Sequence, residues 1–173
     1  MRFEDLIEQY HDEIYRYLWR MLAASGAARH LEAADLTQET FERAYRAYPQ
    51  LRPNRNVRAW LYRIATNRAR TAFRRARHQT PLTDGITHTH ADTAPGPAPL
   101  AQQADDHRRV RGWLAQLPGK QRAAVILRYL ESLSYAEVAE ALGCSVESAR
   151  ANVSHGLRAL RRALAEEERE ASA

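Results

Sequence analysis

The sequence predicts an all-α protein in which a flexible linker joins two small helical domains. Apolar residues recur at the 3.6-residue spacing of a helix in both halves, and no stretch alternates with period two for long enough to make a strand. Between the halves, residues 81–107 contain four Asp, four Pro and no Lys or Arg, a composition that buries too little apolar surface to fold. The 173 residues, 45% of them apolar, suffice for two small domains.

The first half is expected to form three helices. Apolar residues from Phe3 to Met21 share one face of a first helix, which Ser25-Gly26 ends. A second helix runs from about Ala33 to Tyr48, where Pro49 stops it. After a short polar loop from Leu51 to Asn56, a third helix buries Trp60, Leu61, Ile64, Ala65 and Ala72.

The second half begins with two apolar helical stripes. The first stripe contains Val110, Trp113, Leu114 and Leu117. Pro118 then opens a helix, because its fixed backbone angle suits the first turn. The inner face of that helix is predicted to contain Ala123, Ile126, Leu127 and Leu130.

Two further helices have capping signals at their starts. Ser134-Tyr135-Ala136-Glu137 is a capping box, so a helix starts at Tyr135 and turns Val138, Ala139 and Leu142 inward. Gly143 supplies a tight turn, and Ser145 caps a second helix from Val146 to about Leu164. The spacing of Ala139, Gly143 and Ala149 is typical of a DNA-reading helix-turn-helix.

The second of these helices would enter the major groove with its N-terminal half. Arg150 could bind guanine and Asn152 adenine, each worth about 1–3 kcal/mol of discrimination. Arginines further along the helix are placed to hold phosphates. The residues expected at the DNA are Ser145, Ser148, Arg150, Asn152, Ser154, His155, Arg158, Arg161 and Arg162. The alternative is an ordinary solvated face on a three-helix unit.

Charge is concentrated in one block. The chain sums to +5, and residues 51–80 carry nine Arg and no acid, which favours a nucleic acid or an acidic partner. On the third helix Arg70, Arg74 and Arg77 all lie within about 40 degrees of Arg63 around the helix axis, and this stripe can follow a phosphate backbone. Trp60 and Tyr62 adjoin the stripe and could stack on unpaired bases. The alternatives are that Trp60 is a core residue and that the stripe only solubilises the protein.

These features together resemble the extracytoplasmic-function group, group IV, of bacterial RNA polymerase sigma factors in the sigma-70 family. The stretch from Asp35 to Phe41 resembles the signature that docks on the clamp helices of the polymerase largest subunit. The stretch from Arg58 to Asn67 resembles the Trp-Leu-x-x-Ile-Ala-x-Asn segment that melts and reads the minus-ten element. Leu117-Pro118 and the helix-turn-helix resemble the domain that reads the minus-thirty-five element and contacts the polymerase flap.

The resemblance implies a role for each surface. Core polymerase would bind Asp35, Leu36, Gln38, Glu39 and Arg43, which belong to an acidic face that DNA would repel. Minus-ten DNA would bind Asn54, Arg55, Asn56, Arg58, Trp60, Tyr62, Arg63, Asn67, Arg70, Arg74 and Arg77. Three positions depart from the family pattern, namely Arg68, Thr71 and Ala149.

The implied domains are sigma region 2 over residues 1–77, a linker over 78–104, region 4 over 105–166 and an acidic tail over 167–173. The implied function is a sigma factor that directs core RNA polymerase to specific promoters, recognises both promoter elements and melts the DNA. Its partners would be core polymerase, through the clamp helices and the flap, and double- and single-stranded promoter DNA. An anti-sigma factor as a further partner is left open.

The distance between the two promoter elements sets how far apart the two domains must lie when both elements are bound. Promoter elements two or more turns apart, at ~34–36 Å per turn, are separated by ~70–90 Å. A relaxed 27-residue linker spans only ~28 Å. We therefore expect polymerase to draw the linker out and hold the two domains apart.

Two other function classes compete with this one. A stand-alone helix-turn-helix regulator would lack the constellation between Asp35 and Asn67. A metal-dependent hydrolase would need ligands, and His88, His90 and Asp92 lie in the flexible linker, where nothing orders them. Cys144 is the single cysteine and is expected to be a buried, inert thiol. We expect no enzyme, no cofactor and no metal.

The cellular location is inferred from two features, the length of the apolar runs and the charge of the first residues. The longest uninterrupted apolar run, Ala123–Leu127, is far shorter than the ~20 residues of a membrane span. The acids Glu4, Asp5 and Glu8 stand where a signal peptide would be basic and then apolar. We expect a cytoplasmic protein with no direct membrane insertion.

Overall fold

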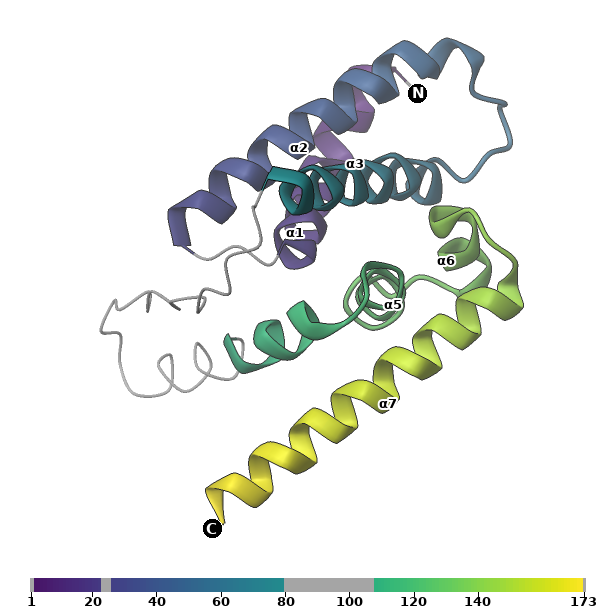
Figure 1. Cartoon of the computed structure of the whole chain (residues 1–173). Coiled ribbons are helices and arrows are strands. Elements are labelled where there is room, and N and C mark those ends of the chain that lie inside the picture. Colours follow the sequence, from purple (N-terminus) through teal and green to yellow (C-terminus); the bar gives the residue numbers. More distant parts are fainter. Residues whose placement is uncertain (1, 23–25, 80–107, 173) are drawn as a thin grey trace.

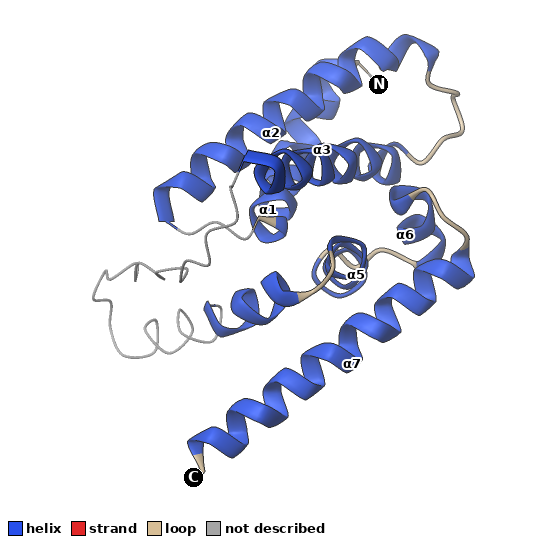
Figure 2. Ribbon diagram, viewed as in Figure 1, coloured by secondary structure: helices blue, strands red, loops and turns tan. Residues whose placement is uncertain are grey.

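The computed structural model describes residues 2–22, 26–79 and 108–172, and every regular element within them is helical (Figure 2). The expected linker lies almost wholly outside the described residues, together with His88, His90 and Asp92. The first module contains α1 (Phe3–Met21), α2 (Gly26–Ala47), a 3₁₀ turn (Tyr48–Gln50) and α3 (Val57–Gln79). The second contains a helical segment over residues 108–116, α5 (Gly119–Val125), a π-helical turn (Ile126–Leu130), α6 (Tyr135–Leu142) and α7 (Val146–Ala171).

The helices of the first module lie where the sequence predicts them, except at their ends. The first helix ends at Met21, and Ser25 lies outside the described residues. The second helix starts at Gly26, well before the expected Ala33. No proline interrupts the alanines and charged residues between these positions, so nothing stops the helix from extending backwards. Pro49 does end it, through the 3₁₀ turn.

The core of the first module lies where the three helices meet. Trp60, Leu61 and Ala65 are buried, as predicted, whereas Ile64 and Ala72 are only half-buried. Trp60 is therefore a core residue, with 8% of its surface exposed.

In the second module, two apolar positions that were expected inside are exposed, and Trp113 and Leu142 are half-buried. Leu130 is 44% exposed and Val110 is 40% exposed, although both were expected inside. For Leu130 the reason is the π-helical turn, whose wider winding changes the direction of the side chains along it. The fully buried Leu133 fills the core instead, and its amide donates to the Leu127 carbonyl at 2.9 Å.

The helix-turn-helix has the predicted caps. The Ser134 amide donates to Glu137 Oε2 at 2.8 Å, and the Glu137 amide donates to Ser134 Oγ at 3.3 Å, which completes the capping box. Gly143 adopts the left-handed conformation, φ 64°, that ends α6. The last helix is longer than expected, because α7 continues to Ala171 and includes most of the residues expected to form a tail.

The two modules pack directly against each other. Figure 1 shows α6 lying close to the start of α3, while α1 faces α5 and the π-helical turn. The Arg122 guanidinium of α5 donates to the carbonyl of Met21 in the first module at 2.7 Å and to the carbonyl of Ala115 in the second at 2.6 Å. The buried apolar residues of both modules belong to one continuous cluster. Polar and apolar contacts thus join the two modules.

Across the described residues, none of the helices has the length and apolarity that a membrane span requires.

Candidate nucleic-acid interface

The loop before α3 faces the helix-turn-helix. Asn56 caps α3, because its Oδ1 accepts from the Ala59 amide at 3.0 Å, and its Nδ2 donates to Glu137 Oε1 at 2.9 Å. The neighbouring Arg55 donates from Nε to Glu140 Oε1 at 3.0 Å. The capping role was missed from the sequence, although an Asn directly before an amphipathic helix is its usual signal.

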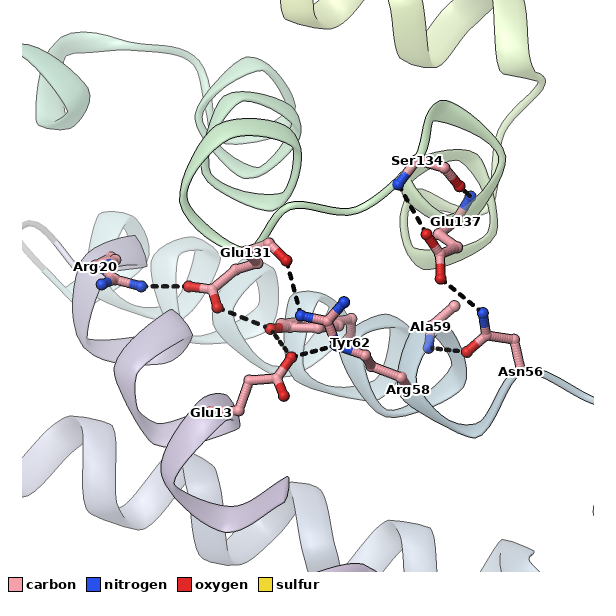
Figure 3. A network of polar contacts seen from close by, with 9 residues as sticks. All are labelled: Glu13, Arg20, Asn56, Arg58, Ala59, Tyr62, Glu131, Ser134 and Glu137. Atoms are coloured by element: carbon pink, nitrogen blue, oxygen red, sulfur yellow. Dashed lines mark hydrogen bonds and ion pairs between the residues drawn. The ribbon is translucent and has the colours of Figure 1, made fainter. Parts of the chain in front are cut away.

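A polar cluster of buried and half-buried side chains joins the modules beside this loop (Figure 3). We call it the interdomain clasp, and it consists of Glu13, Arg20, Arg58, Tyr62 and Glu131. Glu131, only 6% exposed, forms an ion pair with Arg20, and its backbone carbonyl accepts from Arg58 Nη2 at 2.7 Å. Arg58 also forms an ion pair with Glu13. The clasp therefore balances two carboxylates against two guanidinium groups.

Tyr62 lies at the centre of the clasp. Its hydroxyl is 2.6 Å from Glu13 Oε1 and 3.0 Å from Glu131 Oε2. Burial and the carboxylate that accepts from it raise the pKa of Tyr62 far above that of a free phenol. The side chain is fully buried, so stacking on a base would require the modules to separate.

The arginine stripe on α3 is exposed at Arg63, Arg70 and Arg74, and the side chain of Arg77 lies outside the described residues. Arg63 reaches toward the helix-turn-helix, where its Nη2 is 3.8 Å from the position that a Cβ on Gly143 would take. Farther along α3, a cavity of about 760 Å³ lies between the modules. It is lined by Arg70, Phe73, Arg74, Pro118, Gly119, Lys120, Gln121 and Asn152.

A second, open cavity of about 550 Å³ lies between α2 and α3. It brings Trp60 and the exposed Asn67 of α3 together with Arg43 of α2, so residues expected at DNA and at polymerase share one hollow. Arg68 lies at its wall and forms an ion pair with Glu39 at 3.4 Å. The pair gives a charged partner to Arg68, one of the three residues that depart from the family pattern.

The acidic face of α2 is mostly exposed. Asp35, Gln38 and Arg43 are exposed, and Gln38 Nε2 donates to Glu42 Oε1 at 3.0 Å. Leu36 is only 6% exposed and packs in the core, so the exposed part of this face does not include it.

The polar residues of α7 that are expected at DNA differ in exposure and in the partners they already have. Arg150 is exposed and lies over the Tyr135 ring, with 4.5 Å between the guanidinium carbon and the ring centroid. Ser145 Oγ accepts from the Ser148 amide at 3.1 Å, so both serines take part in the cap. Asn152 is half-buried and donates to the Ser148 carbonyl at 2.8 Å. The remaining expected DNA contacts, all exposed, are Ser154, His155, Arg158, Arg161 and Arg162. Asn54, in the loop before α3, is also exposed.

Two other features of the described part of the chain concern metal binding and the single cysteine. No group of three potential metal ligands is found there. Cys144 is half-buried, and burial raises the pKa of its thiol, which fits the expected inert group.

Comparison with known proteins gives consistent results. The family described as Sigma-70 region 2 matches residues 6–79, and Sigma-70, region 4 matches residues 107–160. ECF RNA polymerase sigma factor SigW of Bacillus subtilis is 31% identical, over 94% of this chain and 88% of its own length. RNA polymerase sigma factor YlaC of the same organism is 34% identical, over 83% of this chain and 80% of its own.

Among solved structures, the fold is similar to that of sigma factor RpoE from Bartonella quintana, solved in complex with the anti-sigma factor NepR. The TM-score is 0.72 at 23% identity, covering 94% of this chain and 96% of the other. CnrH, solved with the cytosolic domain of CnrY, gives a TM-score of 0.68 at 21% identity, covering 95% and 88%.

Proposed function

The chain belongs to the extracytoplasmic-function sigma factors of RNA polymerase, and on that premise we propose which of its surfaces performs each step. It directs core RNA polymerase to specific promoters. The single observation that carries this function is the presence of both sigma regions, in order, on one chain that aligns with SigW over 94% of its length. A stand-alone helix-turn-helix regulator is not favoured, because the first module is itself a sigma region. We propose that the chain has no catalysis of its own.

Upstream recognition is assigned to α7. Arg150 and Asn152 would read base edges of the minus-thirty-five element in the major groove, and Arg158, Arg161 and Arg162 would hold phosphates. The exposure of the four arginines supports this assignment. In the structure, the side-chain amide of Asn152 donates to a carbonyl of its own helix. On binding DNA, it would replace that hydrogen bond with one to a base.

Recognition and melting of the minus-ten element are assigned to the loop before α3 and to α3 itself. Asn54, Arg55 and Asn56 would bind a base swung out of the stack, and Arg63, Arg70 and Arg74 would follow the backbone. The exposed cationic stripe supports the backbone contacts. The cavity beside Trp60 and Asn67 offers a place for a base or a sugar.

Docking on polymerase is assigned to the exposed face of α2. Asp35, Gln38, Glu39 and Arg43 would meet the clamp helices, while Leu36 supports that face from within the core. An acidic face suits a basic protein surface and would be repelled by DNA. An anti-sigma factor is a further proposed partner, by analogy with the complexes of RpoE and CnrH.

Transcription in vitro tests the assignment. Core polymerase supplemented with the purified chain should initiate on a subset of fragments of the source genome, and mapping the start sites should reveal a shared pair of upstream elements. Gel filtration should show the chain co-eluting with core polymerase. Initiation at no site, or failure to co-elute, would contradict the function.

A further inference from the structure

We propose that Tyr135 is a positioning residue for upstream recognition, because its ring holds the Arg150 guanidinium where that group reads a base of the minus-thirty-five element. The proposal rests on the function assigned above to α7. Tyr135 is the first residue of α6, so it belongs to the first helix of the helix-turn-helix and not to the helix assigned to the major groove.

The Tyr135 ring is fixed by its surroundings. The capping box that begins at Ser134 sets the backbone at the start of α6. The ring is half-buried and packs against the apolar core. The guanidinium carbon of Arg128 lies 4.9 Å from the ring centroid, and Arg128 is itself anchored, because its Nη1 donates to the Leu133 carbonyl at 2.9 Å. The ring therefore offers Arg150 a rigid surface.

Arg150 contacts this ring without using its hydrogen-bond donors. Its guanidinium carbon lies over the ring, 4.5 Å from the centroid. A guanidinium group that stacks on an aromatic ring uses its face, and its N–H donors point outward in its own plane. Among the described residues, no hydrogen bond or ion pair engages the Arg150 side chain, which is exposed. The donors are therefore available to O6 and N7 of a guanine while the ring still holds the group.

An arginine that is ordered in advance discriminates better between bases. A free arginine side chain loses rotamer freedom when it binds, and one that is already held in place loses less. The same restriction limits the base edges that the group can reach. Asn152 differs, because its Nδ2 donates to the Ser148 carbonyl at 2.8 Å and must give up that bond to read a base. We therefore expect Arg150 to contribute more than Asn152 to the base preference of α7.

Competitive binding of promoter fragments randomised over the upstream element, with core polymerase carrying the full-length chain, tests the role of the ring. Arg150→Ala should abolish a preference for guanine at one position and so identify the base pair that Arg150 reads. Tyr135→Leu should lower that same preference about two- to fivefold, the size expected for a cation–π contact at an exposed site, and should leave the other positions unchanged.

Tyr135→Phe should keep the wild-type preference. Among the described residues, the Tyr135 hydroxyl has no hydrogen-bond partner, so phenylalanine retains every contact that the argument uses. An equal loss of preference in Tyr135→Phe and Tyr135→Leu would overturn the proposal, because it would assign the effect to the hydroxyl and not to the ring.

A matched control makes the same substitution at a neighbouring tyrosine. The Tyr129 ring centroid lies 6.0 Å from the Arg128 guanidinium carbon, and no contact between Tyr129 and Arg150 is found in the described part of the chain. Tyr129→Leu should leave every base preference unchanged. In the Arg150→Ala background, Tyr135→Leu should cause no further loss, because the group that the ring holds is already gone. A loss at all positions alike with Tyr135→Leu would overturn the proposal.

A measurement on the free chain gives a readout that does not depend on DNA. The NMR order parameter of the Arg150 Nε–H bond should be lower in Tyr135→Leu than in the wild type and unchanged in Tyr135→Phe. Should Tyr135→Leu not fold, Tyr135→Met takes its place, because methionine supplies an adaptable apolar side chain without a ring. An Arg150 side chain that is equally ordered with and without the ring would contradict the proposal.

Failure of this proposal is distinguishable from failure of the function. Loss of the guanine preference with Arg150→Ala, together with an unchanged preference in Tyr135→Leu, would refute the role of Tyr135 alone. If Arg150→Ala changed no position while the wild-type chain still selected promoters, the assignment of Arg150 would fail, and the role of Tyr135 with it. A chain that selects no promoters with core polymerase would refute the sigma function itself.

Discussion

The Tyr62 hydroxyl of α3 lies 3.0 Å from Glu131 Oε2, which joins the helix expected to melt DNA to the segment that leads into the helix-turn-helix. The same hydroxyl lies 2.6 Å from Glu13 of α1. A phenol carries one proton, so these two carboxylates compete for it, and Arg20 and Arg58 neutralise the charge around them. This contact between the modules therefore requires the hydroxyl, the two carboxylates and the two guanidinium groups to lie in one particular arrangement.

Alkaline pH should loosen the core of the first module. Burial raises the pKa of Tyr17 and of Tyr62 above the usual value of 10.0. The stability that these neutral phenols contribute is present below that value and is lost as pH rises above it, since the unfolded chain then releases protons that the folded chain retains. The free energy of unfolding should thus fall steeply above pH ~10. Tyr62→Phe should flatten this fall, whereas Tyr129→Phe, at an exposed position, should not.

Asn56 should separate folding from DNA melting. Asn56→Ala removes the α3 cap and should cost about 1 kcal/mol of stability by thermal unfolding. Asn56→Ser keeps a capping oxygen and should cost less, yet it removes the amide donor. Permanganate footprinting of the promoter should show weaker melting with both variants. Normal melting with Asn56→Ser would mean that the donor plays no part.

Arg150 should control upstream recognition. Arg150→Ala should weaken binding to the minus-thirty-five element by about 1–3 kcal/mol and leave polymerase affinity intact. Arg169→Ala, an equal charge loss near the end of the same helix, is the control and should have little effect. Competition binding with mutated upstream elements measures both. An equal loss in the two variants would indicate a general charge effect.

The exposed face of α2 should affect polymerase binding without affecting folding. Gln38→Ala combined with Glu39→Ala should reduce affinity for core polymerase, and circular dichroism should remain unchanged. Among the described residues, the double variant loses the hydrogen bond from Gln38 to Glu42 and the ion pair between Glu39 and Arg68, a partly exposed pair worth less than about 1 kcal/mol. Loss of helicity in the double variant would contradict the assignment of this face to docking.

Two glycines should respond to alanine in opposite directions. A Cβ on Gly156 of α7 would lie 2.6 Å from Val125 Cγ2, a stiff side chain in the core, so Gly156→Ala should destabilise the second module by about 1–3 kcal/mol. Gly112 has open space around it in a helix, and Gly112→Ala should stabilise the protein by about 0.5–1 kcal/mol. Thermal unfolding measures both changes. A gain at Gly156 would show that α7 can move away from α5.

Local signals in the sequence predicted local structure well. The capping box from Ser134 to Glu137 and the turn at Gly143 were confirmed, because each depends on a few neighbouring residues. Leu130 was placed wrongly, since periodicity assumes a regular α-helix and the π-helical turn breaks it. The pairing of Glu131 with Arg20 was not foreseen, because no pattern within either segment connects residues so far apart in the sequence.

The basic residues of the chain are almost all arginines, which makes selective labelling of an amine possible. Lys120 is the one lysine in the sequence, and it lines the cavity between the modules beside Arg70, Phe73 and Arg74. Amine-reactive dyes thus have a single side-chain target, which lies where the two modules meet. A fluorophore attached there would report in real time on the parting of those halves, with no engineered cysteine required.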